Sequence, residues 1–560
     1  MIPPAATAIP PNTQVRSGRR RSAARRLARA ASPAAVAIGF GLLVHATLVW
    51  ERETNHWVRH THDVLERVHH ATTQLVDAET GQRGFLLTGG ERYLEPYRNA
   101  RPRLEREVAA LRALTRDNPR QQRALDTPAE IAHSRLATID RTIALLTLLA
   151  SPVAALLASS PAALAAAAPP AAPPAARASA PVMPGVEVLL RDSLHLLRGK
   201  RVGLITNHTG RDRAGRSTID LLYRAPGVTL AALFGPEHGL RGVAAGGERI
   251  ASTTDSATGV PVFSLYGETL VPTPAMLERV DVLVYDVQDV GARVYTYVWT
   301  MALAADAAKK AGKPFVVLDR PNPIRNDRVE GGVLRPAFRS FVGQYPVALR
   351  YGLTPGELLR YLVGTGQVRA DVTVVPLAGY RRSMWWEETG LPWVNPSPNI
   401  RDPETALLYP GTVFFEATNL SEGRGTDKPL RLVGAPWLRD AGAIARELNA
   451  KHLPGVRFDS TSRAIAPGQE WGGRRIPMVE VRVTDRDSVR PVDVGAHMLR
   501  AIYKRHPRDW RWRANGIEEL SGSPALRRAV QREGGVEQLL RDWEQETARF
   551  RAAVEKYRLY

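Results

Sequence analysis

Short apolar segments that alternate with helical ones constrain the fold of this chain most, from about residue 181 onward. Strands buried on both faces are almost continuously apolar, and the helices between them cover both faces of a parallel sheet. We therefore predict an α/β fold from about residue 181 onward, with a Rossmann-like parallel sheet. The predicted strands are RVGLITN (201–207), VTLAALF (228–234), VDVLVYD (280–286) and PFVVLD (314–319), and the predicted helices include STIDLLYR (217–224) and Thr300–Ala311.

Three of these strands end in turns that carry reactive side chains. The run FGPEHGLRG (234–242) places Glu237, His238 and Arg241 within five positions after a buried strand. Ligands of open α/β sheets bind beyond the carboxyl ends of the strands, so side chains on such turns can share one site. Each turn also has a structural interpretation, such as a surface ion pair for a glutamate or a helix cap for an aspartate. The other two turns, residues 286–297 and 319–323, contribute Asp286, Asp289, Arg293, Tyr295 and Asn322.

A second group of polar side chains lies in the loops of residues 393–411 and 414–430. Asparagine and threonine side chains hydrogen-bond hydroxyl groups, and arginine binds carboxylates through two parallel bonds. Nearby Trp385, Trp386 and Trp393 offer faces for stacking on sugar rings, with packing between domains as the alternative. The pattern indicates a carbohydrate-like pocket that contains acidic residues. Its candidates are Asn395, Asn399, Glu416, Asn419, Ser421, Glu422, Arg424 and Thr426.

Several classes of function are disfavoured by what the sequence lacks. The chain contains no cysteine, which excludes disulfides, thiolate metal sites and cysteine nucleophiles. Its net charge of +20 fits an anionic partner, but no zinc-finger spacing or aromatic RNA-binding signature accompanies that charge. Residues 210–217 resemble a phosphate loop with arginine in place of lysine, and no GxGxxG motif opens a helix after a strand. We therefore expect no metal, no cofactor, no nucleotide and no nucleic-acid partner, and a plain strand-to-helix turn at residues 210–217.

The first 180 residues predict a membrane-associated region. Residues 1–29 form a basic tail, and residues 30–50 form a stretch of 21 uncharged positions, long enough for a transmembrane helix. Basic residues before such a helix place the following chain outside the cytoplasm, and a cleavable signal peptide is the rival interpretation. Residues 51–141 are predicted to be helical, and residues 142–180 combine an apolar, signal-like stretch with an Ala/Pro-rich linker.

These segments predict a location in the cell envelope. We expect either an inner-membrane anchor with a periplasmic catalytic part or an exported protein. The alternative for residues 142–168 is a second membrane span, which would return the C-terminal part to the cytoplasm.

Two resemblances extend these inferences. The segment DAETGQRGFLLTGGERYLEPY (77–97) resembles the third class of CHASE domains, which are helical extracytoplasmic sensor modules of bacterial receptors. From about residue 185 to residue 560 the chain resembles the NamZ-like family of exo-β-N-acetylmuramidases. The motifs that carry this second resemblance are FGPEHGLRG, YDVQDVGARVYTYVWTM, LDRPNPI, NPSPNI, TNLSEGRGT and DWEQETARFRAAVEKYRLY, in that order.

The second resemblance implies a glycosidase. Such proteins remove terminal N-acetylmuramic acid from the non-reducing end of peptidoglycan-derived fragments. Their active site lies in the cleft between a Rossmann-like domain and a smaller C-terminal domain. For this chain the resemblance implies a Rossmann-like catalytic domain over residues 181–404 and a smaller α+β C-terminal domain over residues 405–560. Glycosidic cleavage usually needs two carboxyl groups, and the resemblance makes Glu237 the leading general acid/base. For the second carboxylate we rank Glu422 above Asp289 and Asp286, and the N-acetyl group of the substrate is an alternative nucleophile.

The substrate's lactyl carboxylate needs a cation, for which Arg293 and Arg424 are candidates. The remaining expected substrate contacts are His238, Asp286, Tyr295, Asn322, Asn395, Asn399, Asn419, Ser421 and Thr426.

Two other classes of protein stay open. One is a membrane-anchored sensor that binds muropeptides without cleaving them. The other is an esterase or amidase, which the absence of GxSxG, SxxK and HExxH motifs from the α/β region disfavours.

Overall fold

The computed structural model describes residues 95–116, 181–242, 247–514 and 516–560, together with residues 67, 122 and 140. The chain divides into two compact units, residues 1–171 and 172–560. In the described parts of the chain, none of the helices combines the length and apolar character needed to cross a membrane. The predicted transmembrane helix (30–50), the signal-like segment and linker (142–180) and most of the predicted helical segment (51–141) lie outside the described residues.

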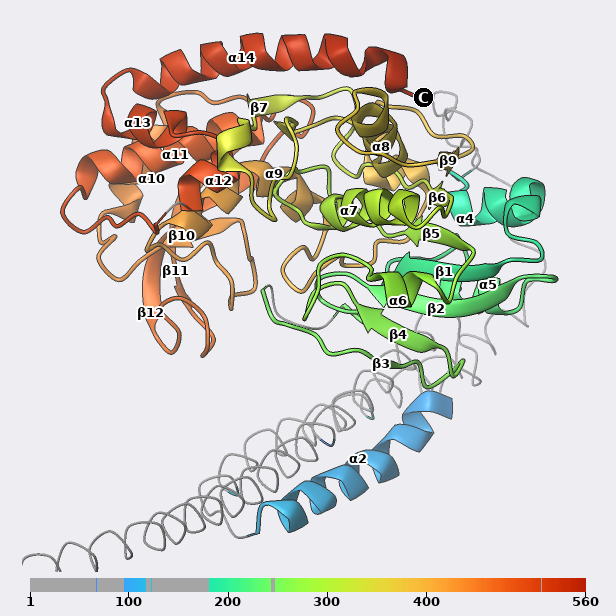
Figure 1. The fold of residues 1–560 in the computed structure, drawn as a ribbon. Coiled ribbons are helices and arrows are strands. Elements are labelled where there is room, and N and C mark those ends of the chain that lie inside the picture. The colour runs from blue at the N-terminus through green and yellow to red at the C-terminus, as the bar shows by residue number, and fades with distance from the viewer. Residues whose placement is uncertain are drawn as a thin grey trace, which may run out of the picture. The chain divides into compact units, whose positions relative to one another are not determined.

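The first unit contains helix α2 (Glu95–Leu114), which falls within the segment predicted to be helical (Figure 1). Leu104 and Leu111 are buried on this helix. They are seven residues apart, which places them on one face two turns apart.

The second unit is built on a sheet of seven strands among the described residues, in the order β3-β4-β2-β1-β5-β6-β9 (Figure 1). Six of the strands are parallel, and β3 pairs antiparallel to β4 at one edge. Counted along the chain, the six parallel strands have the spatial order 3-2-1-4-5-6, which is the Rossmann order, with its switch point between β1 and β5. The bounds are β1 (Arg201–Thr206), β2 (Thr229–Gly235), β3 (Thr253–Thr254), β4 (Pro261–Ser264), β5 (Val282–Asp286), β6 (Phe315–Leu318) and β9 (Val372–Val375).

Helices cover both faces of this sheet, as the continuous apolar strands predict. Alternate side chains of each strand enter different cores: Leu204 of β1 lies in one hydrophobic cluster and Ile205 in the other. One face packs against α4 (Gly185–Val188), η2 (Leu189–Ser193), η3 (Leu194–Leu196) and α5 (Thr218–Tyr223). The other packs against α6 (Pro274–Leu277), α7 (Tyr297–Lys310) and α8 (Pro355–Gly364).

The predicted turn at residues 210–217 is confirmed. It ends in α5, whose first turn is capped by the Ser217 side chain accepting a hydrogen bond from the backbone N–H of Ile219. The predicted strands over residues 201–319 and the two predicted helices are likewise present, with α7 beginning three residues earlier than predicted.

The C-terminal part of the second unit is mixed helix and antiparallel strand. Its small sheet has the order β10-β12-β11 and packs against α10, and α11 to α14 lie above it in the view of Figure 1. A separate antiparallel pair, β7 (Glu330–Val333) with β8 (Ala348–Arg350), connects the parallel sheet to this part. The remaining bounds are η4 (Pro336–Phe338), η5 (Trp386–Thr389), α9 (Pro403–Thr412), η6 (Val413–Ala417), β10 (Leu432–Gly434), α10 (Ala441–Asn449), β11 (Val456–Ala464), β12 (Arg475–Val483), α11 (Pro491–Arg505), α12 (Gly516–Ser521), α13 (Ala525–Gln531), α14 (Gly535–Val554) and η7 (Glu555–Tyr557).

Candidate active site

Glu237 lies two residues beyond the end of β2, at the carboxyl edge of the parallel sheet. Its Oε1 accepts a hydrogen bond from the backbone N–H of Gly247 at 2.9 Å, and its Oε2 accepts one from the Thr296 hydroxyl at 2.5 Å. The Tyr266 hydroxyl also hydrogen-bonds Glu237, and burial together with this carboxylate raises the pKa of Tyr266 to about 12. Three groups from three different segments therefore fix this carboxyl group in position.

Thr296 is the residue before α7, where a threonine side chain often caps the helix. Here the hydroxyl makes no capping bond and is directed to Glu237 instead. We expect Thr296→Val to lower kcat for hydrolysis by about tenfold to a hundredfold, the range for a lost hydrogen bond to a charged group. Steady-state kinetics checks this.

Thr300→Val is the matched control, since Thr300 is one turn further along α7 and its buried hydroxyl has no hydrogen-bond partner among the described residues. Equal losses of kcat in both variants would show that Thr296 does not act through Glu237.

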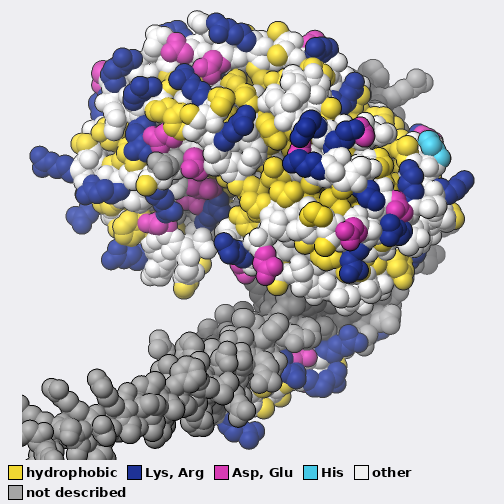
Figure 2. Space-filling model, viewed as in Figure 1, with side chains coloured by type: hydrophobic (Ala, Val, Ile, Leu, Met, Phe, Trp, Pro, Cys, Tyr) yellow, Lys and Arg dark blue, Asp and Glu magenta, His cyan; other side chains and the backbone are white. Residues whose placement is uncertain are grey.

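Four aromatic rings connect the Glu237 turn to the C-terminal part. His238, whose φ of 67° is unusual for a residue other than glycine, meets the edge of Tyr297 with ring centroids 6.4 Å apart. Tyr297 meets Tyr295 at 4.9 Å, and Tyr295 meets Tyr409 of α9 at 5.8 Å. We call His238, Tyr297, Tyr295 and Tyr409 the aromatic wall. Figure 2 shows a hollow on this face of the molecule, between the part with β11 and β12 and the part with the parallel sheet, and acidic side chains gather on its side.

Glu416, Glu422 and Arg424 form an ion-paired group beyond this wall. Arg424 binds Glu422 through Nε at 2.5 Å and binds Glu416 through Nη2. Burial raises the pKa of Tyr409 well above its ordinary value, and the charges of Glu416 and Glu237 raise it further. The 237 turn and the turn after β5 are therefore neighbours, as the strand-end argument predicts, and the loop of residues 414–430 lies beside them.

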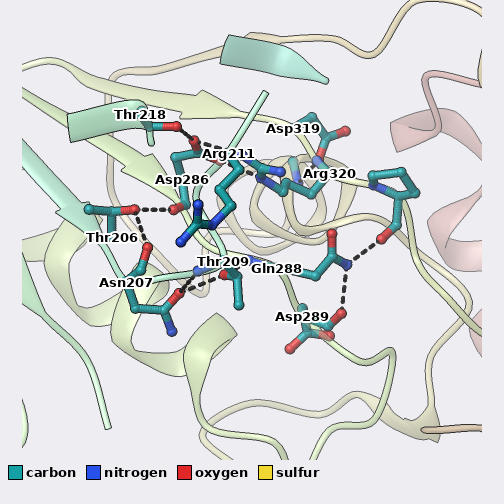
Figure 3. A network of polar contacts seen from close by, with 12 residues as sticks. Thr206, Asn207, Thr209, Arg211, Thr218, Asp286, Gln288, Asp289, Asp319 and Arg320 are labelled. Atoms are coloured by element: carbon teal, nitrogen blue, oxygen red, sulfur yellow. Dashed lines mark hydrogen bonds and ion pairs between the residues drawn. The ribbon is translucent and has the colours of Figure 1, made fainter. Parts of the chain in front are cut away.

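Asp286, predicted as a catalytic or substrate-binding group, lies in a buried ion pair. Its carboxylate is fully buried and receives Nε and Nη2 of Arg320 at 2.5 and 2.9 Å, and the Thr218 hydroxyl at 2.5 Å. Figure 3 shows these side chains converging from the ends of β5 and β6 and from the start of α5. With both oxygens occupied, Asp286 ties three segments together at the switch point.

Asp289, predicted as a catalytic carboxylate, is also buried. Its Oδ2 accepts hydrogen bonds from the backbone N–H of Gly291 at 2.7 Å and from the Tyr351 hydroxyl. Burial raises its pKa to about 7. Asp289 is 2% exposed, and its bonds to Gly291 and Tyr351 shape the turn that carries Tyr295 and Thr296.

The raised pKa of Asp289 predicts a pH dependence of stability. Between about pH 4 and pH 7 the folded protein holds a proton that the unfolded chain has released, so this contribution is complete below about pH 4 and disappears as pH rises through 7. We expect Asp289→Asn, which cannot ionise, to lose less stability than the wild type between about pH 5 and pH 8. Urea denaturation at both pH values measures this, with the exposed Asp220→Asn on α5 as control. Parallel pH dependences of wild type and Asp289→Asn would contradict it.

Arg293, predicted as a ligand for the lactyl carboxylate, is held by backbone carbonyls. Its guanidinium is fully buried and donates to the backbone carbonyls of Gly332, Val347 and Leu520 at 3.3, 3.2 and 2.6 Å. Burial lowers its pKa to about 9. Arg293 therefore connects the parallel-sheet part to α12.

Several predicted substrate contacts instead stabilise their own loops. Asn322 is buried, accepts from the backbone N–H of Ile324 and donates to the carbonyl of Leu353. The Asn419 side-chain amide donates to the backbone carbonyl of Asp509 and accepts from the backbone N–H of Arg511. These two bonds account for the conformation of the Asn419 side chain. Ser421 accepts from Gly423 N–H and Thr426 donates to Gly423 O, so both fix the turn that carries Arg424.

Asn395 and Asn399 remain accessible. The Asn395 side chain is exposed, and its backbone carbonyl bonds the His208 ring at 2.7 Å. Asn399 is half-buried. Both stay predicted substrate contacts.

The tryptophans follow the packing interpretation. The Trp385 ring lies under the guanidinium groups of Arg325 and Arg486, at 5.4 and 5.1 Å from its centroid. Trp386 and Trp393 meet edge to face at 5.2 Å.

Sequence reasoning missed Tyr266, Thr296 and Tyr409 as parts of this site. Thr296 lies inside a motif that had been recognised, next to Tyr295, but nothing in the sequence says that it faces Glu237. Tyr266 follows β4, a four-residue strand that was not predicted. Its position after an apolar run at the same sheet edge was the signal that could have found it.

Comparisons with known proteins identify the family. The family model for the N-terminal part of exo-β-N-acetylmuramidase NamZ matches residues 202–404, the model for its C-terminal part matches residues 407–560, and a CHASE3 domain model matches residues 54–159. The chain is 42% identical over 380 residues to the peptidoglycan β-N-acetylmuramidase NamZ of Bacillus subtilis, covering 68% of this chain and 91% of that protein.

Two crystal structures of DUF1343 family proteins from Bacteroides fragilis are also similar. One has a TM-score of 0.64 at 37% identity and covers 69% of this chain and 100% of its own. The other has a TM-score of 0.54 at 27% identity and covers 68% and 99%. The mixed α/β fold with its mostly parallel sheet, the matched family models and the identity to the B. subtilis protein place this chain in the NamZ family of exo-β-N-acetylmuramidases.

Proposed function

We propose that this protein is an exo-β-N-acetylmuramidase, which releases terminal N-acetylmuramic acid from the non-reducing end of peptidoglycan fragments. Family membership and the 42% identical muramidase relative support this activity. The single observation that carries it is the placement of Glu237, fixed by Thr296, Tyr266 and the Gly247 N–H at the carboxyl edge of the sheet. Open α/β sheets bind their ligands at this edge.

Glu237 acts as the general acid that protonates the leaving oxygen. Its Oε1 faces a backbone N–H, which can only donate, so Oε1 remains a hydrogen-bond acceptor. Its Oε2 faces the Thr296 hydroxyl, which can either donate or accept. The proton that passes to the substrate is therefore carried on Oε2. Arg424 is the remaining proposed partner of the lactyl carboxylate, and it would contact that group beside the two glutamates that it already binds.

The fold and location complete the proposal. Residues 181–404 form the Rossmann-like catalytic domain, and residues 405–560 form the smaller domain that completes the cleft. The uncharged stretch at residues 30–50 anchors the protein in the inner membrane with the enzyme outside the cytoplasm. Protease treatment of intact spheroplasts tests this location, since a cytoplasmic enzyme part would be protected.

A direct assay tests the activity. The full-length protein is incubated with the disaccharide of N-acetylmuramic acid β-linked to N-acetylglucosamine, and the products are identified by mass spectrometry. Release of free N-acetylmuramic acid is the expected result. Saturable binding of the disaccharide without any release would instead support a sensor that does not cleave.

A further inference from the structure

Glu416 and Glu422 share one guanidinium but differ in their access to solvent. The Glu422 side chain is 10% exposed, and its burial and the charge of Glu416 raise its pKa. The Glu416 side chain is 32% exposed. A carboxylate that acts on a bound sugar needs accessible surface, which Glu416 has and Glu422 lacks.

Glu416 also has the closer structural connection to Glu237. It lies seven residues after Tyr409, on η6, which continues α9 directly. Two helical turns separate the two residues, so both project from one side of this helical segment. Tyr409 forms the end of the aromatic wall that begins at His238, the neighbour of Glu237.

Tyr409 lies near both carboxyl groups, because the charges of Glu416 and Glu237 both contribute to its raised pKa. The rings of the aromatic wall are mostly buried, so they form a fixed connection from the turn that carries Glu237 to the helix that carries Glu416. In inverting glycosidases one carboxyl group protonates the leaving oxygen, and the other acts on a water molecule at the opposite face of the sugar.

We infer that Glu416, and not Glu422, is the second catalytic carboxylate of this enzyme, with Arg424 and Glu422 as the residues that position it. The inference rests on the proposed muramidase activity. Glu416 removes a proton from a water molecule as the water oxygen forms a bond with the anomeric carbon. The bond from this carbon to the leaving oxygen breaks, its electron pair stays on that oxygen, and Glu237 supplies the proton that completes the released alcohol. Glu416 ends protonated and Glu237 ionised, and solvent exchange restores both.

Rescue by azide tests this assignment. Glu416→Ala is expected to lower kcat on a chromogenic β-N-acetylmuramide by about 10²- to 10⁴-fold, the usual contribution of a general base. Azide is an anionic nucleophile that attacks the anomeric carbon without help from a general base. Added sodium azide should therefore restore turnover of Glu416→Ala and give, with inversion, the α-glycosyl azide. Glu422→Ala is the matched variant, and azide should not restore its turnover. Rescue of Glu422→Ala but not of Glu416→Ala would overturn the inference.

Two further measurements test the role of Glu416 even if Glu416→Ala does not fold. Glu416→Gln preserves side-chain volume, and its thermal unfolding is compared with that of the wild type. A folded Glu416→Gln with nearly full activity would overturn the inference even if Glu416→Ala does not fold. NMR should detect the α anomer of N-acetylmuramic acid first in the wild-type reaction, and initial formation of the β anomer would exclude the base role.

The same assays separate the two proposals. A wild-type protein that releases no N-acetylmuramic acid would refute the proposed function. An active wild type whose Glu416 variants keep their activity would refute the further inference alone.

Discussion

Replacement of Glu237 with glutamine is expected to lower kcat for release of N-acetylmuramic acid by roughly 10²- to 10⁴-fold, the range for loss of a general acid. Glutamine has nearly the same volume and can still accept from the Gly247 N–H and bond the Thr296 hydroxyl, so the fold should be unaffected. It cannot deliver a proton to the leaving oxygen. Initial rates with a β-linked chromogenic muramide measure the loss, and circular dichroism verifies folding.

Comparing two substrates with different leaving groups tests the role of Glu237 as the general acid. A nitrophenolate departs with little need for protonation, whereas the sugar hydroxyl of the natural disaccharide needs a proton. The loss of kcat in Glu237→Gln should therefore be larger on the disaccharide than on the nitrophenyl muramide. Glu278→Gln, an exposed glutamate that follows α6 in the same sheet domain, is the control. A Glu237→Gln enzyme as active as Glu278→Gln on the disaccharide would remove Glu237 from the mechanism.

Replacement of Arg320 with methionine is expected to destabilise the fold by about 3–5 kcal/mol, the loss measured when one partner of a buried ion pair is removed. Arg320 is 5% exposed at its side chain and Asp286 is 0% exposed, so the remaining carboxylate would be buried with the Thr218 hydroxyl as its remaining side-chain donor. Because this pair connects the ends of β5 and β6 beside the switch point, the catalytic turns should loosen with it (Figure 3). Urea denaturation monitored by tryptophan fluorescence measures the free energy of unfolding.

A second ion pair of the same sheet provides the control. Arg201 and Asp281 pair at the opposite end of β1, with side chains 49% and 38% exposed. Exposed pairs contribute little because water and salt already screen both charges. Arg201→Met should therefore change the stability only slightly. Similar losses in Arg201→Met and Arg320→Met would show that burial does not govern the strength of the Asp286–Arg320 pair.

Much of the catalytic edge could be predicted from local sequence. A buried parallel strand must be apolar on both faces, so its residues identify it, and the first polar turn after it must lie at the carboxyl edge of the sheet. This reasoning located the turns that carry Glu237 and Tyr295 in one region, and the polar pattern of residues 414–430 identified the segment that carries Glu416. It also separated the 210–217 turn from a nucleotide site, because the arginine in place of lysine and the missing glycine pattern are local features.

The same reasoning could not decide which polar side chain on each turn faces the substrate. Asp286 and Asp289 are as polar in sequence as Glu237, yet the first pairs with Arg320, 34 residues away, and the second with Tyr351, 62 residues away. Arg293 finds one of its carbonyl partners at Leu520, 227 residues away. A buried charged group requires such partners, and no local pattern reveals them.

By itself, then, the sequence determined the order of strands and helices, the turns that carry reactive groups and the family to which the chain belongs. These features depend on residues close together in the chain or on the family's motifs. Only the tertiary structure decided which acidic and basic side chains are accessible and which are buried. Glu237 and Glu416 keep accessible carboxylates, whereas Asp286, Asp289 and Arg293 are buried and bonded to other parts of the fold. The physical reason is that burial and pairing set the chemistry of an ionisable group, and both arise from segments that meet only after folding.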